Sequence, residues 1–178
     1  MPKRLKKLSE EVMHENPWWK YKRDRYVLPT GLEGEYYYAE TPGIAMIIPV
    51  LENGTIALTL QYRYLADKQS IEFPAGGIKH YEPQEAARRE LEEETGYIAD
   101  ELIKLAVVEP ANGFVKDTMH IFLARVSTAN TQRLDDTEEI DILYRKPEEI
   151  DRMIIQGDIW CGETVAAWFF ARHHLFQD

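Results

Sequence analysis

The chain has 178 residues, 44% of them hydrophobic, and its 31 acidic residues outnumber 21 lysines and arginines, giving a formal net charge of -10 at pH 7. This composition predicts one globular protein with a substantial core and excludes a disordered chain. Its hydrophobic runs are too short for a membrane-spanning helix and no secretory signal is readable, so we expect a cytoplasmic protein without membrane contact. The acidic balance disfavours nucleic acid as a partner, and a single cysteine excludes an internal disulfide.

The amino-terminal segment reads as an extension that precedes the main domain. Residues 3–14 are rich in helix-forming residues and predict a short helix. Residues 21–28 and 35–40 predict two strands on either side of a turn at Pro29-Thr30-Gly31. We therefore expect an extension of helix and strands over residues 1–42 and the main domain over residues 43–178.

The main domain mixes strands and helices. Two apolar runs, residues 44–51 and 55–62, are joined through Asn53-Gly54 and predict a β-hairpin. A short strand at residues 71–73 leads into a loop, and residues 83–95 predict a helix that ends at Gly96. Further strands are expected at 102–108, 119–126 and 140–144, and further helices at 147–156 and 163–173. The order predicts an α/β or α+β fold in which helices cover a sheet.

Residues 83–95 carry an unusual concentration of acidic side chains near the end of the helix. That placement opposes the helix dipole, and Glu90 and Glu94 form a like-charge pair one turn apart. Both lie on the flank of the inward stripe that contains Ala87 and Leu91. Gathered carboxylates are the ligands that Mg²⁺ or Mn²⁺ prefers, so a metal site is one interpretation. A solvated acidic helix paired with its own arginines is the other.

The same segment resembles the Nudix hydrolase box, which reads Arg-Glu, an apolar residue, any residue, Glu-Glu, any residue, Gly and an apolar residue. Every fixed place is filled, by Arg89, Glu90, Leu91, Glu93, Glu94, Gly96 and Tyr97. A chance match in a chain of this length is on the order of 10⁻⁵. Upstream, Gly76 and Glu82 keep the family spacing, but the loop from Glu82 to Arg89 is one residue short, which places Tyr81 where the family has glutamate.

The resemblance implies a Nudix α/β/α sandwich with a mixed sheet and an enzyme that depends on Mg²⁺ or Mn²⁺. It also implies roles for individual residues. Arg89 would orient the glutamates, and Glu93 would bind metal or hold a metal-bound water. The implied metal ligands are the Ala75 carbonyl, Glu90, Glu93 and Glu94.

Other segments are similar to the ADP-ribose and nucleotide-sugar pyrophosphatase branch of that family, among them residues 61–63, 71–76 and 113–117. The amino-terminal strands are similar to the dimerising extension of this branch, which implies a homodimer. Where many ADP-ribose enzymes have Ser-Pro-Gly, this chain has Ala111-Asn112-Gly113, so the identity of the sugar stays open. The substrate-binding residues that we expect are Arg63, Glu72, Asp117, Trp18, Trp19 and Arg25.

The expected reaction is metal-dependent hydrolysis of the diphosphate of a nucleoside diphosphate sugar, giving a nucleoside monophosphate and a sugar phosphate. Glu138, in the acidic segment before the last predicted strand, is the expected general base or an additional metal ligand, with Glu139 as the alternative residue. Two other functions stay open. One is hydrolysis of nucleoside triphosphates or RNA 5′ ends, and the other is a Nudix-fold sensor that binds nucleotide sugars without cleaving them.

Overall fold

The computed structural model describes residues 3–176, which form two compact units. The first contains the described chain up to Pro42 together with Glu109–Thr118, and the second contains Gly43–Val108 and the described chain from Met119 onward. The sequence did not indicate that Glu109–Thr118, inside the predicted main domain, joins the first unit.

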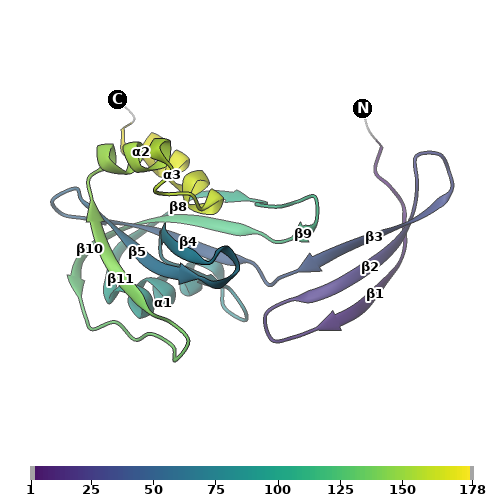
Figure 1. Cartoon of the computed structure of the whole chain (residues 1–178), viewed down its shortest axis with the longest axis horizontal. Coiled ribbons are helices and arrows are strands. Elements are labelled where there is room, and N and C mark those ends of the chain that lie inside the picture. Colours follow the sequence, from purple (N-terminus) through teal and green to yellow (C-terminus); the bar gives the residue numbers. More distant parts are fainter. Residues whose placement is uncertain (1–2, 177–178) are drawn as a thin grey trace. The chain divides into compact units, whose positions relative to one another are not determined.

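The first unit is a sheet in the order β1-β2-β3-β9 (Figure 1). Its strands are β1 (Lys7–Glu15), β2 (Lys20–Val27), β3 (Glu33–Glu40) and β9 (Val115–Lys116). The first three are antiparallel, whereas β9 runs parallel to β3. Two main-chain hydrogen bonds, from Ala39 N to Phe114 O (3.0 Å) and from Thr41 N to Lys116 O (3.2 Å), attach Glu109–Thr118 to this sheet.

The predicted helix at residues 3–14 is wrong, because this segment forms strand β1. Pairing with β2 decides its conformation: Glu11 lies opposite Arg23 in the register, and their side chains form an ion pair at 2.5 Å. Glu10 likewise bonds Lys22 at 2.8 Å. These cross-strand contacts outweigh an intrinsic helix preference that amounts to a few tenths of a kcal/mol per residue.

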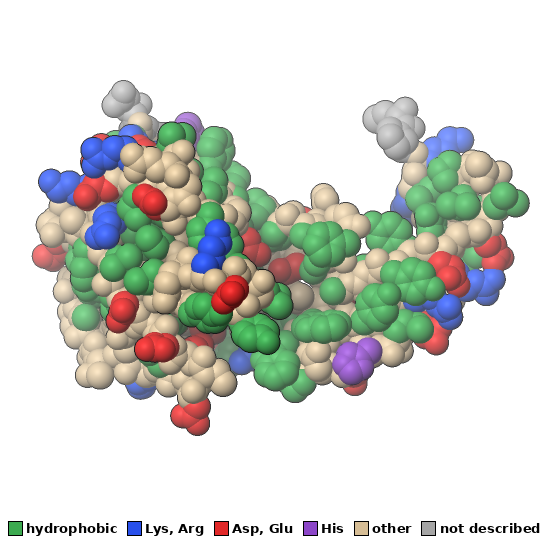
Figure 2. All heavy atoms as spheres, in the orientation of Figure 1, with side chains coloured by type: hydrophobic (Ala, Val, Ile, Leu, Met, Phe, Trp, Pro, Cys, Tyr) green, Lys and Arg blue, Asp and Glu red, His purple; other side chains and the backbone are tan. Residues whose placement is uncertain are grey.

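The first unit has almost no buried interior. Within residues 3–42 and 109–118, Lys22 is the only residue classed as buried, and its ammonium pairs with Glu10 and Glu40. Hydrogen bonds from Lys22 and Lys7 lower the pKa of Glu10 to about 2. Figure 2 shows hydrophobic side chains on the visible face of these strands, among charged ones. The sheet is therefore held by its ladder and ion pairs rather than by an apolar core.

The second unit contains a mixed sheet in the order β11-β5-β4-β10-β8, with β6 added beside β5 and β7 beside β4. β4 and β10 are parallel, and the other pairs are antiparallel. The strands are β4 (Ile44–Leu51), β5 (Ile56–Arg63), β6 (Lys68–Glu72), β7 (Ala75–Gly77), β8 (Tyr97–Val108), β10 (Met119–Ala129) and β11 (Ile140–Arg145). The helices are α1 (Pro83–Thr95), α2 (Pro147–Gln156), α3 (Gly162–Leu175) and the 3₁₀ turn η1 (Tyr64–Ala66).

Strand β4 shows how the sheet is covered on both faces. Met46 and Ile48 point into a cluster that contains Ile150 of α2 and Trp168 of α3, among other residues. The intervening Ile47 belongs to a second cluster, with Ala86, Ala87 and Leu91 of α1. Helix α1 therefore covers one face of the sheet, and α2 and α3 cover the other (Figure 1). The predicted α/β/α sandwich with a mixed sheet is confirmed.

In this unit the boundaries of β4, α1 and α2 agree with the predicted ones to the residue, and those of the other predicted elements except β8 differ by at most three residues. The predicted hairpin is present at its turn, where Leu51 N donates to Thr55 O at 2.9 Å and Gly54 has φ +78°. Strand β8 begins five residues earlier than expected, because its start at Tyr97 pairs with Ala129 at the end of β10. In the described part of the chain, no helix is long and apolar enough to cross a membrane.

Candidate active site

Helix α1 presents the acidic residues from a fixed position on the sheet. It begins at Pro83, a residue suited to the first helical turn, and ends at Gly96, whose φ of +76° strongly favours glycine. Ala87 and Leu91 are fully buried against the strands. This packing anchors the face of the helix that carries Glu90 and Glu94.

Both glutamates lie against the short strand β7. A Cβ atom placed on Gly76 would lie 2.0 Å from Glu90 Cδ, so the Glu90 carboxylate occupies the space above a residue without a side chain. Glu94 is only 5% exposed, and its Oε2 accepts a hydrogen bond from Ala75 N at 3.2 Å. The family resemblance implies a site formed by the Ala75 carbonyl and the two glutamates, and in the structure it is the Ala75 N–H group that contacts Glu94. The sequence marks Gly76 only as a position of the Nudix box, and no local pattern indicates its close approach to Glu90.

The environment of these carboxylates disfavours negative charge. Burial and the Glu90 carboxylate raise the pKa of Glu94 to about 8. Burial and the Glu93 carboxylate raise the pKa of Glu90 to about 7. The negative charge of Glu138 also raises the pKa of both groups, by less than burial does. Negative charge on Glu90 and Glu94 is therefore energetically costly, and a bound cation would offset that cost.

The donor set fits a hard divalent cation. Glu90 and Glu94 supply carboxylate oxygens, and the Ala75 main chain lies beside them. Among residues 3–176, no three His, Cys, Asp or Glu side chains form a ready-made metal cage. Magnesium sites that act on phosphates typically use one or two carboxylates and complete their coordination with water and phosphate oxygens. Glu94, which is buried, and Glu90, which is partly buried, match that pattern.

Arg89 contacts the acidic cluster of α1, which consists of Glu90, Glu93 and Glu94, through Glu93. Its guanidinium donates to Glu93 Oε1 at 3.2 Å, and it lies 4.3 Å from the ring centroid of Tyr81. Tyr81 stands where the family pattern has glutamate, so an aromatic face contacts the arginine in place of a carboxylate. Glu82 directly precedes the helix, and its side chain makes no capping hydrogen bond.

Arg63 and Glu72, both expected to bind substrate, bind each other. Arg63 Nε donates to Glu72 Oε1 at 2.8 Å, and Nη2 bonds the second oxygen of the same carboxylate. Glu72 is buried and Arg63 is largely exposed. Arg63 also opposes the rise in the pKa of Glu94, so its charge acts on the acidic cluster. The buried glutamate thus fixes an arginine beside the candidate metal site.

Glu138 lies in the exposed segment between β10 and β11. Its Oε2 accepts a hydrogen bond from Asp135 N at 2.9 Å, and its own N–H donates to Asp135 O at 2.9 Å. The negative charge of Glu138 adds a smaller contribution to the raised pKa values of Glu90 and Glu94. Glu139 directly precedes β11, whose first residue, Ile140, lies opposite Gln61 in the sheet.

The other expected substrate residues belong to the first unit. Trp18 and Trp19 lie between β1 and β2, 70% and 42% exposed, and the Asn16 side chain accepts hydrogen bonds from both main-chain N–H groups. Arg25 pairs with Glu33 across the sheet. Asp117 accepts a hydrogen bond from Thr41 Oγ1 at 2.5 Å.

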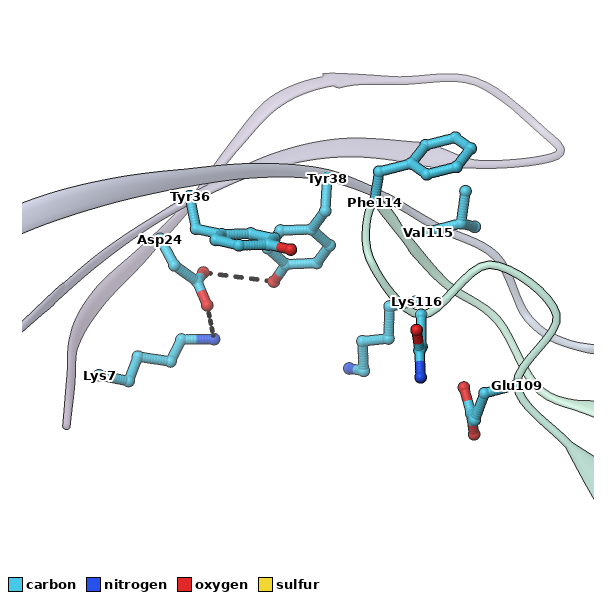
Figure 3. A pocket seen from close by; sticks show the side chains of 9 residues that line it. Lys7, Asp24, Tyr36, Tyr38, Glu109, Phe114, Val115 and Lys116 are labelled. Carbon is cyan, nitrogen blue, oxygen red and sulfur yellow. Dashed lines mark hydrogen bonds and ion pairs between the residues drawn. The ribbon is translucent and has the colours of Figure 1, made fainter. Parts of the chain in front are cut away.

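The first unit also contains a pocket of about 300 Å³ that sequence reasoning missed (Figure 3). Its wall includes Tyr36, Tyr38 and Phe114, and Asp24 accepts a hydrogen bond from Tyr38 Oη at 3.2 Å. Lys7 pairs with the same carboxylate at 2.8 Å. None of the four expected substrate residues of this unit lines it. The alternation of side chains along β3 could have indicated this pocket, because it places Tyr36 and Tyr38 on the same face of the sheet.

Comparison with known proteins identifies the family. Residues 41–167 match the NUDIX domain. An ADP-ribose pyrophosphatase of Bacillus subtilis (strain 168) is 31% identical over 143 residues, covering 79% of this chain and 77% of that protein. A methanol dehydrogenase activator of Bacillus methanolicus is 30% identical over 147 residues, covering 81% and 80%. A crystal structure of an ADP compounds hydrolase shares the fold, with a TM-score of 0.84 and 20% identity over 97% of this chain and 95% of that one. The chain belongs to the NUDIX domain family.

Proposed function

We propose that this protein hydrolyses the diphosphate bond of a nucleoside diphosphate sugar of the ADP-ribose type. The products are a nucleoside monophosphate and a sugar phosphate. One observation carries the proposal: in a chain of the NUDIX domain family, Glu90 and Glu94 are held together against the β7 backbone with raised pKa values. The likeness to an ADP-ribose pyrophosphatase supports the substrate class.

The cofactor that we propose is Mg²⁺, with Mn²⁺ as a substitute, held by Glu90, Glu94, the Ala75 carbonyl and Glu93. When bound, the cation offsets the charge of the diphosphate and makes water more acidic. Arg89 holds Glu93 in place through its hydrogen bond. Arg63, oriented by Glu72, contributes positive charge toward the diphosphate. Glu138 accepts the proton of the attacking water.

We also propose that the protein acts as a homodimer joined through its amino-terminal sheet. Few residues of this unit are buried, and a large exposed apolar surface is typical of a protein–protein contact. Its exposed large apolar side chains include Leu8, Val12, Met13, Trp18, Trp19, Tyr21 and Tyr37. Covering them with a second copy would remove this surface from water.

A substrate panel tests the proposed function. Purified protein with Mg²⁺ is incubated with ADP-ribose, GDP-mannose, UDP-glucose, ATP and a 5′-triphosphorylated RNA, and the products are separated by anion-exchange chromatography. The proposal expects kcat/KM to be highest for a nucleotide sugar, with its nucleoside monophosphate as product. Preferred release of pyrophosphate from ATP or RNA would contradict it. Binding of a nucleotide sugar without cleavage would indicate a sensor instead.

A further inference from the structure

The carboxyl end of α1 is connected to the segment between β10 and β11 by a series of hydrogen bonds. Asn130 N donates to Gly96 O at 2.7 Å, and Arg133 N donates to Glu93 O at 2.9 Å. Between them, Gln132 Nε2 donates to Glu94 O at 2.6 Å. The last carbonyls of a helix have no partner within the helix, so this segment satisfies them from outside.

Gly96 permits this close approach. A Cβ atom at residue 96 would lie 2.1 Å from the Asn130 carbonyl oxygen. The glycine that ends the acidic motif therefore has two functions here: it adopts a positive φ, and it leaves room for the segment that follows β10.

Gln132 is the one side chain of this segment that reaches both α1 and the start of β11. Its amide group donates to Glu94 O and also to Ile140 O at 3.2 Å. It is partly buried, whereas Thr131, Arg133 and residues 135–139 are exposed. One amide thus joins the helix that carries the acidic cluster to the residue that follows the Glu138 turn.

We propose that Gln132 is a positioning residue: by joining the carboxyl end of α1 to the start of β11, it holds the turn that carries Glu138 beside the helix of Glu90 and Glu94. The inference rests on the proposed function, because it assigns Gln132 an effect only through the role of Glu138. With the two hydrogen bonds removed, the main-chain bond from Arg133 N to Glu93 O would remain, but the start of β11 at Ile140 would lose its side-chain link to α1. Glu138 would then sample positions away from Glu90 and Glu94.

A double-mutant cycle with Glu138 tests this role. Gln132→Met keeps the length of the side chain and removes both donors. We expect kcat to fall about 10-fold with KM unchanged. In a Glu138→Gln background the same change should alter kcat by less than about twofold. Asn130→Ala is the matched control, because it removes only an exposed 3.5 Å side-chain bond and keeps the main-chain donor, so its kcat should equal the parent value.

Three kinetic results would overturn the inference: an unchanged kcat in Gln132→Met, an effect confined to KM, or an equal loss of kcat in the Glu138→Gln background. If Glu138→Gln alone lowers kcat while Gln132→Met does not, the proposed function stands and only the positioning role fails. If the protein cleaves no nucleotide sugar, the proposed function itself fails.

Hydrogen exchange measures the positioning role without any substrate. Residues 133–139 should exchange faster in Gln132→Met than in the parent or in Asn130→Ala. Equal exchange in all three proteins would overturn the role. Gln132→Ala, in which water can reach both carbonyls, provides the same comparison if the methionine variant does not fold.

Discussion

The carboxylate of Glu90 occupies the space that a side chain on Gly76 would fill, since a Cβ atom there would lie 2.0 Å from Glu90 Cδ. Gly76 has no positive φ, so the backbone accepts alanine and the contact alone decides the outcome. We expect Gly76→Ala to displace Glu90 and to lower kcat/KM at least ~10²-fold while the protein stays folded. Steady-state kinetics together with circular dichroism would measure both effects.

The neighbouring glycine provides the control for this substitution. A Cβ atom on Gly77 would meet only the flexible Lys79 side chain, at 3.9 Å. Gly77→Ala should therefore retain parental activity. If both variants are equally active, the position of Glu90 against β7 has no importance for the reaction.

Stability of the metal-free protein should depend on pH in the direction set by Glu90 and Glu94. On folding, the pKa of Glu90 rises from 4.5 to about 7 and that of Glu94 from 4.5 to about 8. Between about pH 4.5 and pH 8 the folded state therefore binds more protons than the unfolded state. The contribution of these two groups to the free energy of unfolding is fully present below about pH 4.5 and is lost as the pH rises toward 8. With chelator present, Tm should fall across this range.

Added Mg²⁺ should reverse that loss. Because a cation binds the deprotonated carboxylates, it should raise Tm more at pH 8 than at pH 6. Glu94→Gln removes one of the two groups and should weaken both the pH dependence and the Mg²⁺ effect. Differential scanning fluorimetry of the two proteins would measure this, and an equal Tm response to Mg²⁺ in both would exclude Glu94 as a ligand.

Glu138 and Glu139 should differ in their effect on turnover. A general base acts in the transition state, so Glu138→Gln should lower kcat and kcat/KM by a similar factor of at least about 10². Glu139→Gln serves as the adjacent control and should be close to the parent. The opposite result would assign the role to Glu139, and two fully active variants would exclude this acidic segment from catalysis.

The proposed dimer predicts a molecular mass in solution of twice that of the 20.8 kDa chain. Light scattering coupled to size exclusion at micromolar concentration would measure it. Val12→Asp, a charge on the exposed amino-terminal sheet, should shift the mass toward that of the monomer, whereas Ile155→Asp on α2 should leave it unchanged. A parent protein that runs as a monomer would rule the dimer out.

Local patterns in the sequence predicted the sandwich well. Helix α1 was predicted to the residue because Pro83 and Gly96 mark its ends, and the Asn53-Gly54 turn was recognised from its residues alone. The acidic cluster followed from the spacing of Glu90 and Glu94 on one side of that helix. These features depend on interactions between residues close in the sequence, which a single sequence displays.

Features that depend on distant partners were missed. Strand β1 has the composition of a helix and becomes a strand only because β2 pairs with it. The Arg63–Glu72 pair joins neighbouring strands, so two expected substrate residues proved to be each other's partners. Gln132 contacts the end of α1 across 38 residues of chain, and no local pattern marks it. The predicted and observed sites therefore differ mainly in contacts between residues that are distant in the sequence.

The metal dependence of ADP-ribose cleavage by the purified protein tests the central proposal most directly. AMP release is followed with Mg²⁺ present, after chelation, and after Mg²⁺ is restored, in the parent and in Glu94→Gln. We predict that chelation abolishes release in the parent, that Mg²⁺ restores it, and that Glu94→Gln stays at least about 10²-fold slower throughout. An undiminished rate under chelation, or a fully active Glu94→Gln, would contradict the assignment of α1 as the metal-binding element.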